Sequence, residues 1–193
     1  FRGFRSRSIA ELVRKDTGWA PKTLLMERIS GREVVNSNVI WDDTSSVVSE
    51  TRVPELDLTE VHPLDDRMKV NVLDPYSAVL RLLSQIEKTG DCTSSYEIYD
   101  GRRRSRIYFE KIGKIVLEQD RPGVFTGSAM VCGVKFDPIG GHRINSKWRS
   151  NKDQKGRVKM FFARPRQGQI MPVRIEVRSW IGKIIGRLDL RQM

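Results

Sequence analysis

The sequence predicts a mainly β protein in which a strongly curved antiparallel sheet wraps around one main helix. Several segments alternate apolar and polar residues, as half-buried strands do. Short turn signals separate many of these segments, and only one long stretch, residues 74–89, repeats its apolar residues at helical spacing. Because 193 residues suit one domain, residues 1–193 are expected to fold as a single domain.

The main helix is defined by both of its ends. Asp74 is a suitable N-cap, Pro75 fits the first helical position, and Gly90 follows the last turn. The apolar residues between them recur three or four positions apart: Ala78, Val79, Leu82, Leu83 and Ile86. This spacing predicts one buried face.

A second, short helix is expected near residues 8–15. Ser8 to Glu11 matches the S-x-x-E capping box, and the apolar residues that follow form one stripe. Gly18 lies close to its expected end.

Most of the remaining chain is predicted to form strands. The dipeptide Asp100-Gly101 is a strong turn signal, and it predicts a hairpin that joins Tyr96–Tyr99 to Ile107–Phe109. Further strands are expected at residues 24–35, 38–53, 124–136, 158–163, 172–180 and 183–191. Residues 56–68 and 139–156 are predicted connections, the second of them a positively charged loop.

The formal net charge of +11 is distributed unevenly. Residues 1–100 contain 13 basic and 17 acidic residues, whereas residues 101–193 contain 22 and 7. A difference of this size creates a long-range field that favours an anionic partner, such as nucleic acid, lipid head groups or an acidic protein. The alternative is a solvated basic face that keeps the protein soluble. The sequence has no apolar run of 18 or more residues, the length expected of a membrane-spanning helix.

Four arginines beside the predicted hairpin turn are candidates for binding an anion or a lipid head group. They are Arg102, Arg103, Arg104 and Arg106. Guanidinium groups offer paired donors to phosphate oxygens. Together with the nearby tyrosines, they form the combination of basic and aromatic residues that is typical of sites for single-stranded nucleic acid. The alternative is that these arginines protect an exposed strand from edge-to-edge aggregation.

No motif for catalysis or metal binding is present in the sequence. The two histidines, His62 and His142, have no partner at triad or metal-ligand spacing. Cys92 and Cys132 are compatible with one disulfide in a secreted protein or with two buried thiols in a cytosolic one. We therefore expect a protein that is not an enzyme and that has no cofactor or metal.

Several motifs occur in an order that resembles a known bacterial family. They are Asp74-Pro75-Tyr76-Ser77-Ala78-Val79-Leu80, then Cys92, then Tyr99 to Arg104, then Gly127 to Cys132, and finally Pro138 to His142. Over residues 74–193 the chain resembles the uncharacterised family known as domain of unknown function 3108, in its alphaproteobacterial form.

The resemblance implies a fold and a compartment. The expected fold is like that of the periplasmic lipoprotein carriers, a half-open antiparallel β-barrel with a helix across its mouth. Family members are typically exported with a signal peptide, which implies a periplasmic protein. The resemblance also places Cys92 and Cys132 at the cysteine positions of the family, which implies a disulfide between them. They have further sequence before the segment that matches Phe1 to Arg7, so a signal peptide and one or two strands are expected upstream.

We therefore predict a cell-envelope protein that binds a lipid, a lipoprotein or another envelope component and supports envelope integrity. The candidate groove-lining or core residues are Val79, Leu82, Leu83, Ile86, Met130 and Val134. The anionic membrane surface is a further expected partner. The alternatives are a basic nucleic-acid-binding module, which is not expected of an exported protein, and a scaffold that binds an envelope protein through an open sheet edge.

Overall fold

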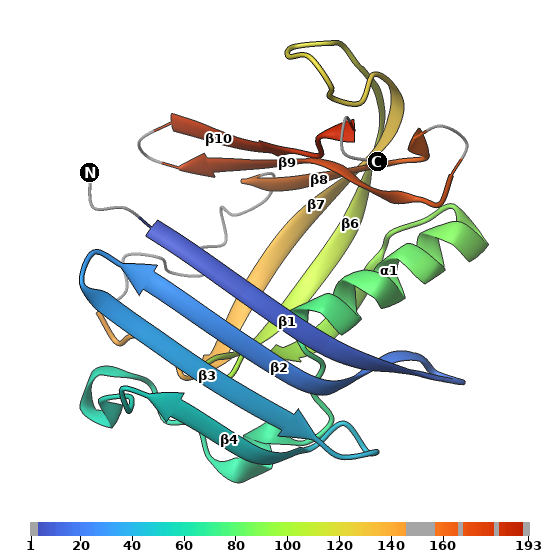
Figure 1. Cartoon of the computed structure of the whole chain (residues 1–193). Coiled ribbons are helices and arrows are strands. Elements are labelled where there is room, and N and C mark those ends of the chain that lie inside the picture. Colours follow the sequence, from blue (N-terminus) through green and yellow to red (C-terminus); the bar gives the residue numbers. More distant parts are fainter. Residues whose placement is uncertain (1–3, 146–156, 166–167, 180–181, 191–193) are drawn as a thin grey trace. The chain divides into compact units, whose positions relative to one another are not determined.

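The protein is mainly β with one α-helix, as predicted (Figure 1). A computed structural model describes residues 4–145, 157–165, 168–179 and 182–190. Its strands are β1 (Phe4–Lys15), β2 (Gly18–Ser30), β3 (Glu33–Trp41), β4 (Val47–Val53), β5 (Ser94–Tyr99), β6 (Arg104–Leu117), β7 (Gly127–Gly140), β8 (Val158–Ala163), β9 (Met171–Ser179) and β10 (Gly182–Arg187). Two 3₁₀ turns, η1 (Leu58–Glu60) and η2 (Asp66–Lys69), precede the helix α1 (Pro75–Thr89).

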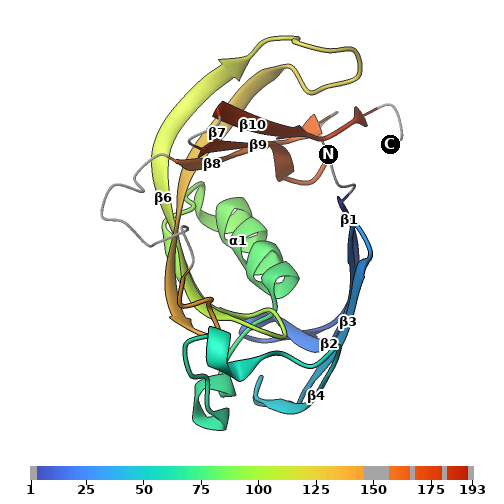
Figure 2. The ribbon, with the colours of Figure 1, turned by 90° about the vertical axis from the view of Figure 1, so that its left-hand side faces the viewer.

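The described strands form two antiparallel sheets where the sequence led us to expect one. The first sheet has the order β1-β2-β3-β4, and the second has the order β10-β9-β8-β7-β6-β5. Both orders are open, so each sheet has two edge strands. Figure 2 shows β1 to β4 as one ribbon layer and β6 beside β7 as a long antiparallel pair.

The described chain forms two compact units. The first contains described residues of segments 1–81, 96–106 and 137–149, and the second contains those of 82–95, 107–136 and 150–193. A core of the first unit is formed by Leu24, Val39, Trp41, Val72 and Tyr99. A core of the second is formed by Leu117, Ala129, Val131, Phe161, Ala163 and Val173. The chain crosses repeatedly from one unit to the other, and α1, β5, β6 and β7 each contribute residues to both.

The main helix has the ends that the sequence predicts. The Asp74 carboxylate accepts hydrogen bonds from the backbone N–H groups of Tyr76 (2.8 Å) and Ser77 (3.2 Å), and it also contacts the Ser77 hydroxyl. At the other end, the Gly90 N–H donates to the Ile86 carbonyl (2.9 Å), with Gly90 at a φ of +68°. Local capping chemistry therefore sets both boundaries.

Replacing Asp74 with alanine is expected to destabilise the protein by about 1–2 kcal/mol, because the first helical N–H groups lose a buried acceptor. Asp74→Asn should recover most of this loss, since the amide keeps an acceptor and burial already raises the pKa of Asp74. Urea unfolding of the three proteins checks both expectations. Equal losses for the two variants would show that the charge itself is needed.

The predicted short helix at residues 8–15 is wrong. These residues belong to β1, which pairs with β2 from Phe4↔Ser30 to Lys15↔Gly18. Asp16 and Thr17 form the hairpin turn, and Gly18 has a φ of +105° there. The S-x-x-E pattern is compatible with a helix start, but twelve residues of strand pairing override this weak local preference.

The predicted hairpin at Asp100-Gly101 is confirmed. β5 and β6 are neighbours in the sheet, and the Asp100 N–H donates to the Arg103 carbonyl across the turn (3.2 Å). The predicted strands at 124–136, 158–163, 172–180 and 183–191 correspond to β7, β8, β9 and β10, and the bounds of β8 agree with the prediction. The predicted strands at 24–35 and 38–53 are wrong in their division, because the chain turns at 31–32 and at 42–46 and forms the three strands β2, β3 and β4 there. Part of the predicted basic loop, residues 146–156, lies outside the described residues, as do residues 180 and 191 of the predicted final strands.

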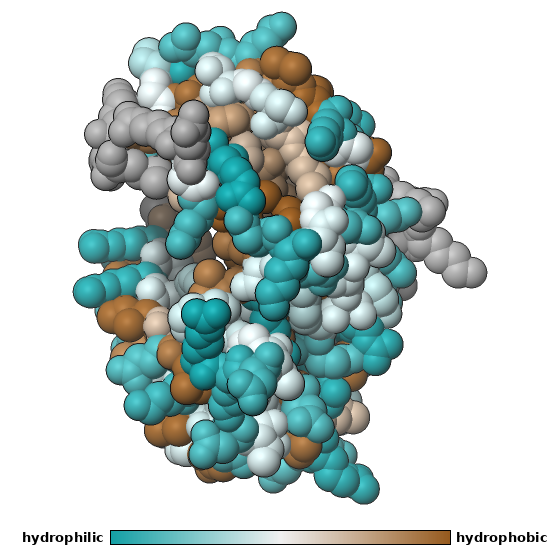
Figure 3. Space-filling view, turned by 90° about the vertical axis from the view of Figure 1, so that its right-hand side faces the viewer, coloured by the Kyte–Doolittle hydropathy of each residue, from teal (hydrophilic) through white to brown (hydrophobic). Residues whose placement is uncertain are grey.

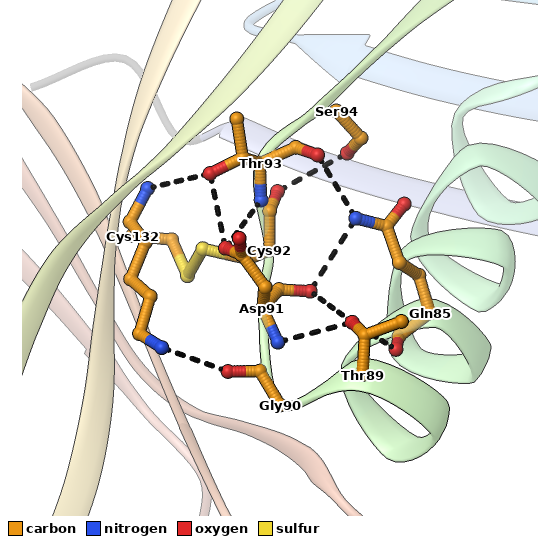
Figure 4. The surroundings of a disulfide bond; sticks show 9 residues. Gln85, Thr89, Gly90, Asp91, Cys92, Thr93, Ser94 and Cys132 are labelled. Carbon is orange, nitrogen blue, oxygen red and sulfur yellow. Dashed lines mark hydrogen bonds between the residues drawn. A yellow bond between two sulfur atoms is a disulfide. The ribbon is translucent and has the colours of Figure 1, made fainter.

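Cys92 and Cys132 form a disulfide within the second unit (Figure 4). Both residues are fully buried. Around Cys92, side chains fasten the end of α1 to two neighbouring strands. Gln85 donates to the Thr93 carbonyl just before β5 (2.9 Å), and Lys111 of β6 donates to the Gly90 carbonyl (2.9 Å). The disulfide adds a covalent tie from this junction to β7.

The predicted groove or core residues are covered to different degrees. Leu82, Ile86, Met130 and Val134 are buried, whereas Val79 and Leu83 are half-buried.

Hydrophilic side chains cover much of the face seen in Figure 3, as expected of a chain with 31% charged residues.

Candidate functional site

A cavity of about 880 Å³ lies within the first unit, beside β4, an edge strand of the four-stranded sheet. The rest of its wall is formed by the acidic connection 56–68 with its flanking residues Glu55 and Lys69, by the turn between β5 and β6, and by Gly141 after β7. The lining residues are Glu50, Thr51, Arg52, Glu55, Leu56, Leu58, Val61, His62, Pro63, Leu64, Asp65, Lys69, Tyr99, Gly101, Arg102 and Gly141. The volume falls in the range of ligand pockets, roughly 300–1,000 Å³.

Two segments that the sequence marks as separate connections meet at this cavity. The His62 N–H donates to the His142 carbonyl (2.8 Å), and the Gly141 N–H donates to the His62 carbonyl (3.0 Å). The Ile144 N–H donates in turn to the Glu60 carbonyl (2.9 Å). These backbone bonds hold the acidic connection 56–68 in place as one wall of the cavity.

Gly141 allows the close backbone approach that shapes the cavity floor. It has a φ of +71°, and a Cβ atom there would lie 1.9 Å from the carbonyl oxygen of Arg102. Gly101, at a φ of +80°, similarly passes close to Val39, whose Cγ2 would lie 2.9 Å from an added Cβ. Gly101 and Gly141 thus both line the same cavity.

One acidic residue of the wall is already neutralised by its neighbours. Glu50 accepts a hydrogen bond from the Tyr99 hydroxyl (2.5 Å) and pairs with the Lys69 ammonium (2.5 Å). Burial raises the pKa of Tyr99, and its bond to Glu50 raises it further, so the hydroxyl stays protonated as a donor. This network joins β4, β5 and the connection behind the cavity.

Arg52 and Arg102 bring unpaired positive charge to the cavity. Neither guanidinium makes a hydrogen bond or ion pair with another residue that the structure describes, and the Nε atoms of both are buried without a partner. Burial lowers the pKa of Arg52, and the charge of Arg28 lowers it further. Burial also lowers the pKa of Arg102, as do the charges of Arg103, Arg143 and Arg52.

The other arginines of the predicted anion-binding cluster have partners within the chain. Arg103 makes two bonds to the Asp100 carboxylate (2.9 and 2.6 Å). Arg104 pairs with Glu97 (3.2 Å) and donates to the Met68 carbonyl (2.7 Å), and Arg106 also pairs with Glu97. Of the four predicted arginines, Arg102 alone lines the cavity. The second arginine of the cavity is Arg52, which was not among the predicted site residues.

His142 is held behind the cavity by the residues of the hairpin. Its Nε2 lies 3.1 Å from the Arg104 carbonyl oxygen and 3.1 Å from the Ser105 hydroxyl. Because a carbonyl only accepts, Nε2 carries the proton and donates to Arg104. Burial lowers the pKa of His142 below its ordinary 6.5, although the bond to Arg104 opposes this shift.

His142 is expected to make the protein less stable in mild acid. With its folded pKa depressed, the unfolded chain binds the proton more readily, so the free energy of unfolding should fall as the pH drops below 6.5. His142→Gln, which keeps an N–H donor for Arg104, should flatten this dependence. Urea unfolding across that pH interval checks it, and an unchanged slope in the variant would assign the effect to other groups.

None of the six predicted groove-lining residues lines this cavity. Among the residues that the structure describes, no helix is long and apolar enough to cross a membrane. Within the same residues, no three potential metal-binding side chains are grouped together. No family model, curated protein or solved structure matches the chain.

Proposed function

We propose that this protein is a non-enzymatic component of the bacterial cell envelope that binds a lipid, a lipoprotein or another envelope component. The observation that carries the proposal is the cavity beside β4, which combines an apolar wall with two unpaired arginines. Such a mixture of apolar surface and a few placed polar groups is typical of ligand pockets.

The buried disulfide supports the compartment in this proposal. Disulfides persist in oxidising environments such as the periplasm and are rare in the cytosol. The periplasm is also the location implied by the resemblance of residues 74–193 to an exported bacterial family. A signal peptide upstream of Phe1 remains a prediction.

Internal pairing of the hairpin arginines favours this function over the nucleic-acid alternative. Asp100 and Glu97 engage Arg103, Arg104 and Arg106, so binding phosphates would require these ion pairs to open. The scaffold alternative retains a structural basis, since β4 is an open edge to which a partner strand could be added.

Native mass spectrometry of the protein purified from its own cell envelope tests the proposal. The expected result is a fraction of the protein that carries a co-purified lipid-sized mass, and delipidated protein that binds a fluorescent fatty-acid probe. If the purified protein has only the mass of the chain and the delipidated protein binds no amphiphile, the proposal is wrong. Retention of a protein partner without any lipid would favour the scaffold.

A further inference from the structure

Arg52 and Arg102, the two arginines of the cavity, differ from other arginines of the first unit in their lack of a carboxylate partner among the described residues. Elsewhere in the first unit, Arg28, Arg103 and Arg104 each have a carboxylate partner. Arg52 and Arg102 have none among the residues that the structure describes, although their Nε atoms are buried. Both side chains are half-buried, and a buried polar atom without a partner costs free energy, so this pair needs an explanation.

The carboxylates nearby do not supply the missing partner. Glu50 is committed to Tyr99 and Lys69, and Asp100 makes two bonds to Arg103. Asp65 accepts from the Met68 N–H (3.1 Å) and pairs with Arg67. Glu55 lines the cavity but is exposed. No carboxylate among the described residues therefore bonds to either guanidinium group, although Asp100 attracts both through space. Both groups are available to bind an anionic ligand.

The chemistry of the two groups indicates which anion would fit. Arginine stays protonated at physiological pH even when its pKa is lowered. Its planar fork matches the oxygen atoms of a carboxylate or a phosphate. Arg102 lies close enough to Arg52 for the two charges to repel, so one anionic group between them would relieve the repulsion.

The rest of the wall indicates what carries the anionic group. The acidic connection 56–68 contributes an apolar surface to the cavity through Leu56, Leu58, Val61, Pro63 and Leu64. Leu58 is 76% exposed and shares the cavity wall with these other apolar side chains, so the site offers a grouped apolar surface rather than one isolated exposed residue. A free inorganic anion would use the arginines but leave this surface in water.

We propose that the cavity binds an amphiphile whose carboxylate or phosphate head group lies between Arg52 and Arg102 and whose apolar chain covers Leu58 and its neighbours. This inference rests on the proposed function and names the ligand class for the same site. It also implies that neutral lipids bind poorly, since they leave both guanidinium groups unpaired.

Titration calorimetry on delipidated protein, with three probes, tests the ligand class. Dodecyl phosphate should bind at least about tenfold more tightly than dodecanol, which lacks the charge, and more tightly than inorganic phosphate, which lacks the chain. Equal affinity for dodecyl phosphate and dodecanol would overturn this inference but leave lipid binding intact. Equal affinity for dodecyl phosphate and inorganic phosphate would indicate a simple anion site and also overturn it. If none of the three binds, the proposed function fails as well.

Four single variants test the assignment of the head-group site. Arg52→Gln and Arg102→Gln should each weaken dodecyl phosphate binding about tenfold and leave dodecanol binding unchanged. Arg5→Gln is the matched control: it removes the same charge from β1, away from the cavity, and should change the affinity less than twofold. Glu55→Gln should strengthen dodecyl phosphate binding, because it removes the exposed carboxylate of the wall. Equal losses in all three arginine variants would mean that net charge alone acts.

Thermal unfolding without ligand separates a binding role from a structural one. Removing a half-buried charge that has no partner should leave the melting temperature of Arg52→Gln and Arg102→Gln unchanged or higher than that of the native protein. Both variants should then show a smaller upward shift on addition of dodecyl phosphate. A lower melting temperature in the absence of ligand would show that the arginines hold the fold together and would overturn their assignment as a ligand site.

Discussion

Replacing Cys92 and Cys132 together with alanine is expected to lower the free energy of unfolding by at least about 4 kcal/mol. The bridge closes a loop with a sequence separation of 40 residues, and the loss of this constraint favours the unfolded chain by roughly that amount. Both residues are fully buried, so the smaller side chains also leave space in the second unit. Urea unfolding of the double variant measures the loss.

The reduced native protein is the control for this prediction. It lacks the bridge but keeps both sulfur atoms, so it should lose the constraint without the packing defect. We expect its stability to lie between those of the oxidised protein and the double variant. An oxidised and a reduced protein of equal stability would show that the contacts of Figure 4, such as Gln85 with Thr93, hold this junction without the bridge.

Replacing Gly141 with alanine is expected to cost at least about 3 kcal/mol and to disrupt the cavity. The new Cβ atom would lie 1.9 Å from the Arg102 carbonyl oxygen, so the two backbones must separate. The left-handed conformation at a φ of +71° adds about 1–2 kcal/mol for any residue with a Cβ atom. Urea unfolding measures the cost, and loss of dodecyl phosphate binding by the folded fraction reports on the cavity.

Gly90→Ala is the matched control for Gly141→Ala. Gly90 has a similar φ of +68°, but nothing lies within 4 Å of the position of an added Cβ. Gly90→Ala should therefore cost only the free energy of placing a Cβ atom in the left-handed conformation, about 1–2 kcal/mol. If the two variants lose the same stability, the close approach at Arg102 contributes nothing and the description of the cavity floor is wrong.

The parts of the fold that local chemistry determines could be predicted from the sequence. The ends of α1 follow from Asp74, Pro75 and Gly90, each of which acts within one turn of its own position. The hairpin at Asp100-Gly101 is likewise local. The segment at residues 8–15 was misassigned because its strand character depends on pairing with β2 rather than on its own capping pattern. The alternation of apolar and polar residues along a strand does not indicate which sheet the strand joins, so the division into two sheets could not be predicted.

The candidate site was predicted only in part, because its residues meet through long-range pairing. Arg102 belongs to a visible arginine cluster, but the identity of its unpaired member depends on how Asp100 and Glu97 pair with the others. Arg52 lies in an ordinary strand and carries no local signal. The apolar residues of the acidic connection 56–68 were the available clue, because several apolar residues grouped in one connection without strand or helix periodicity are compatible with an apolar binding surface.

The most direct test of this account is a crystal structure of the delipidated protein with dodecyl phosphate that carries a terminal bromine. Phosphate oxygen atoms are expected within about 3 Å of the guanidinium groups of both Arg52 and Arg102. The anomalous bromine peak is expected near the apolar wall formed by Leu56, Leu58 and Leu64. A ligand bound outside this cavity, or a phosphate that contacts neither arginine, would contradict it.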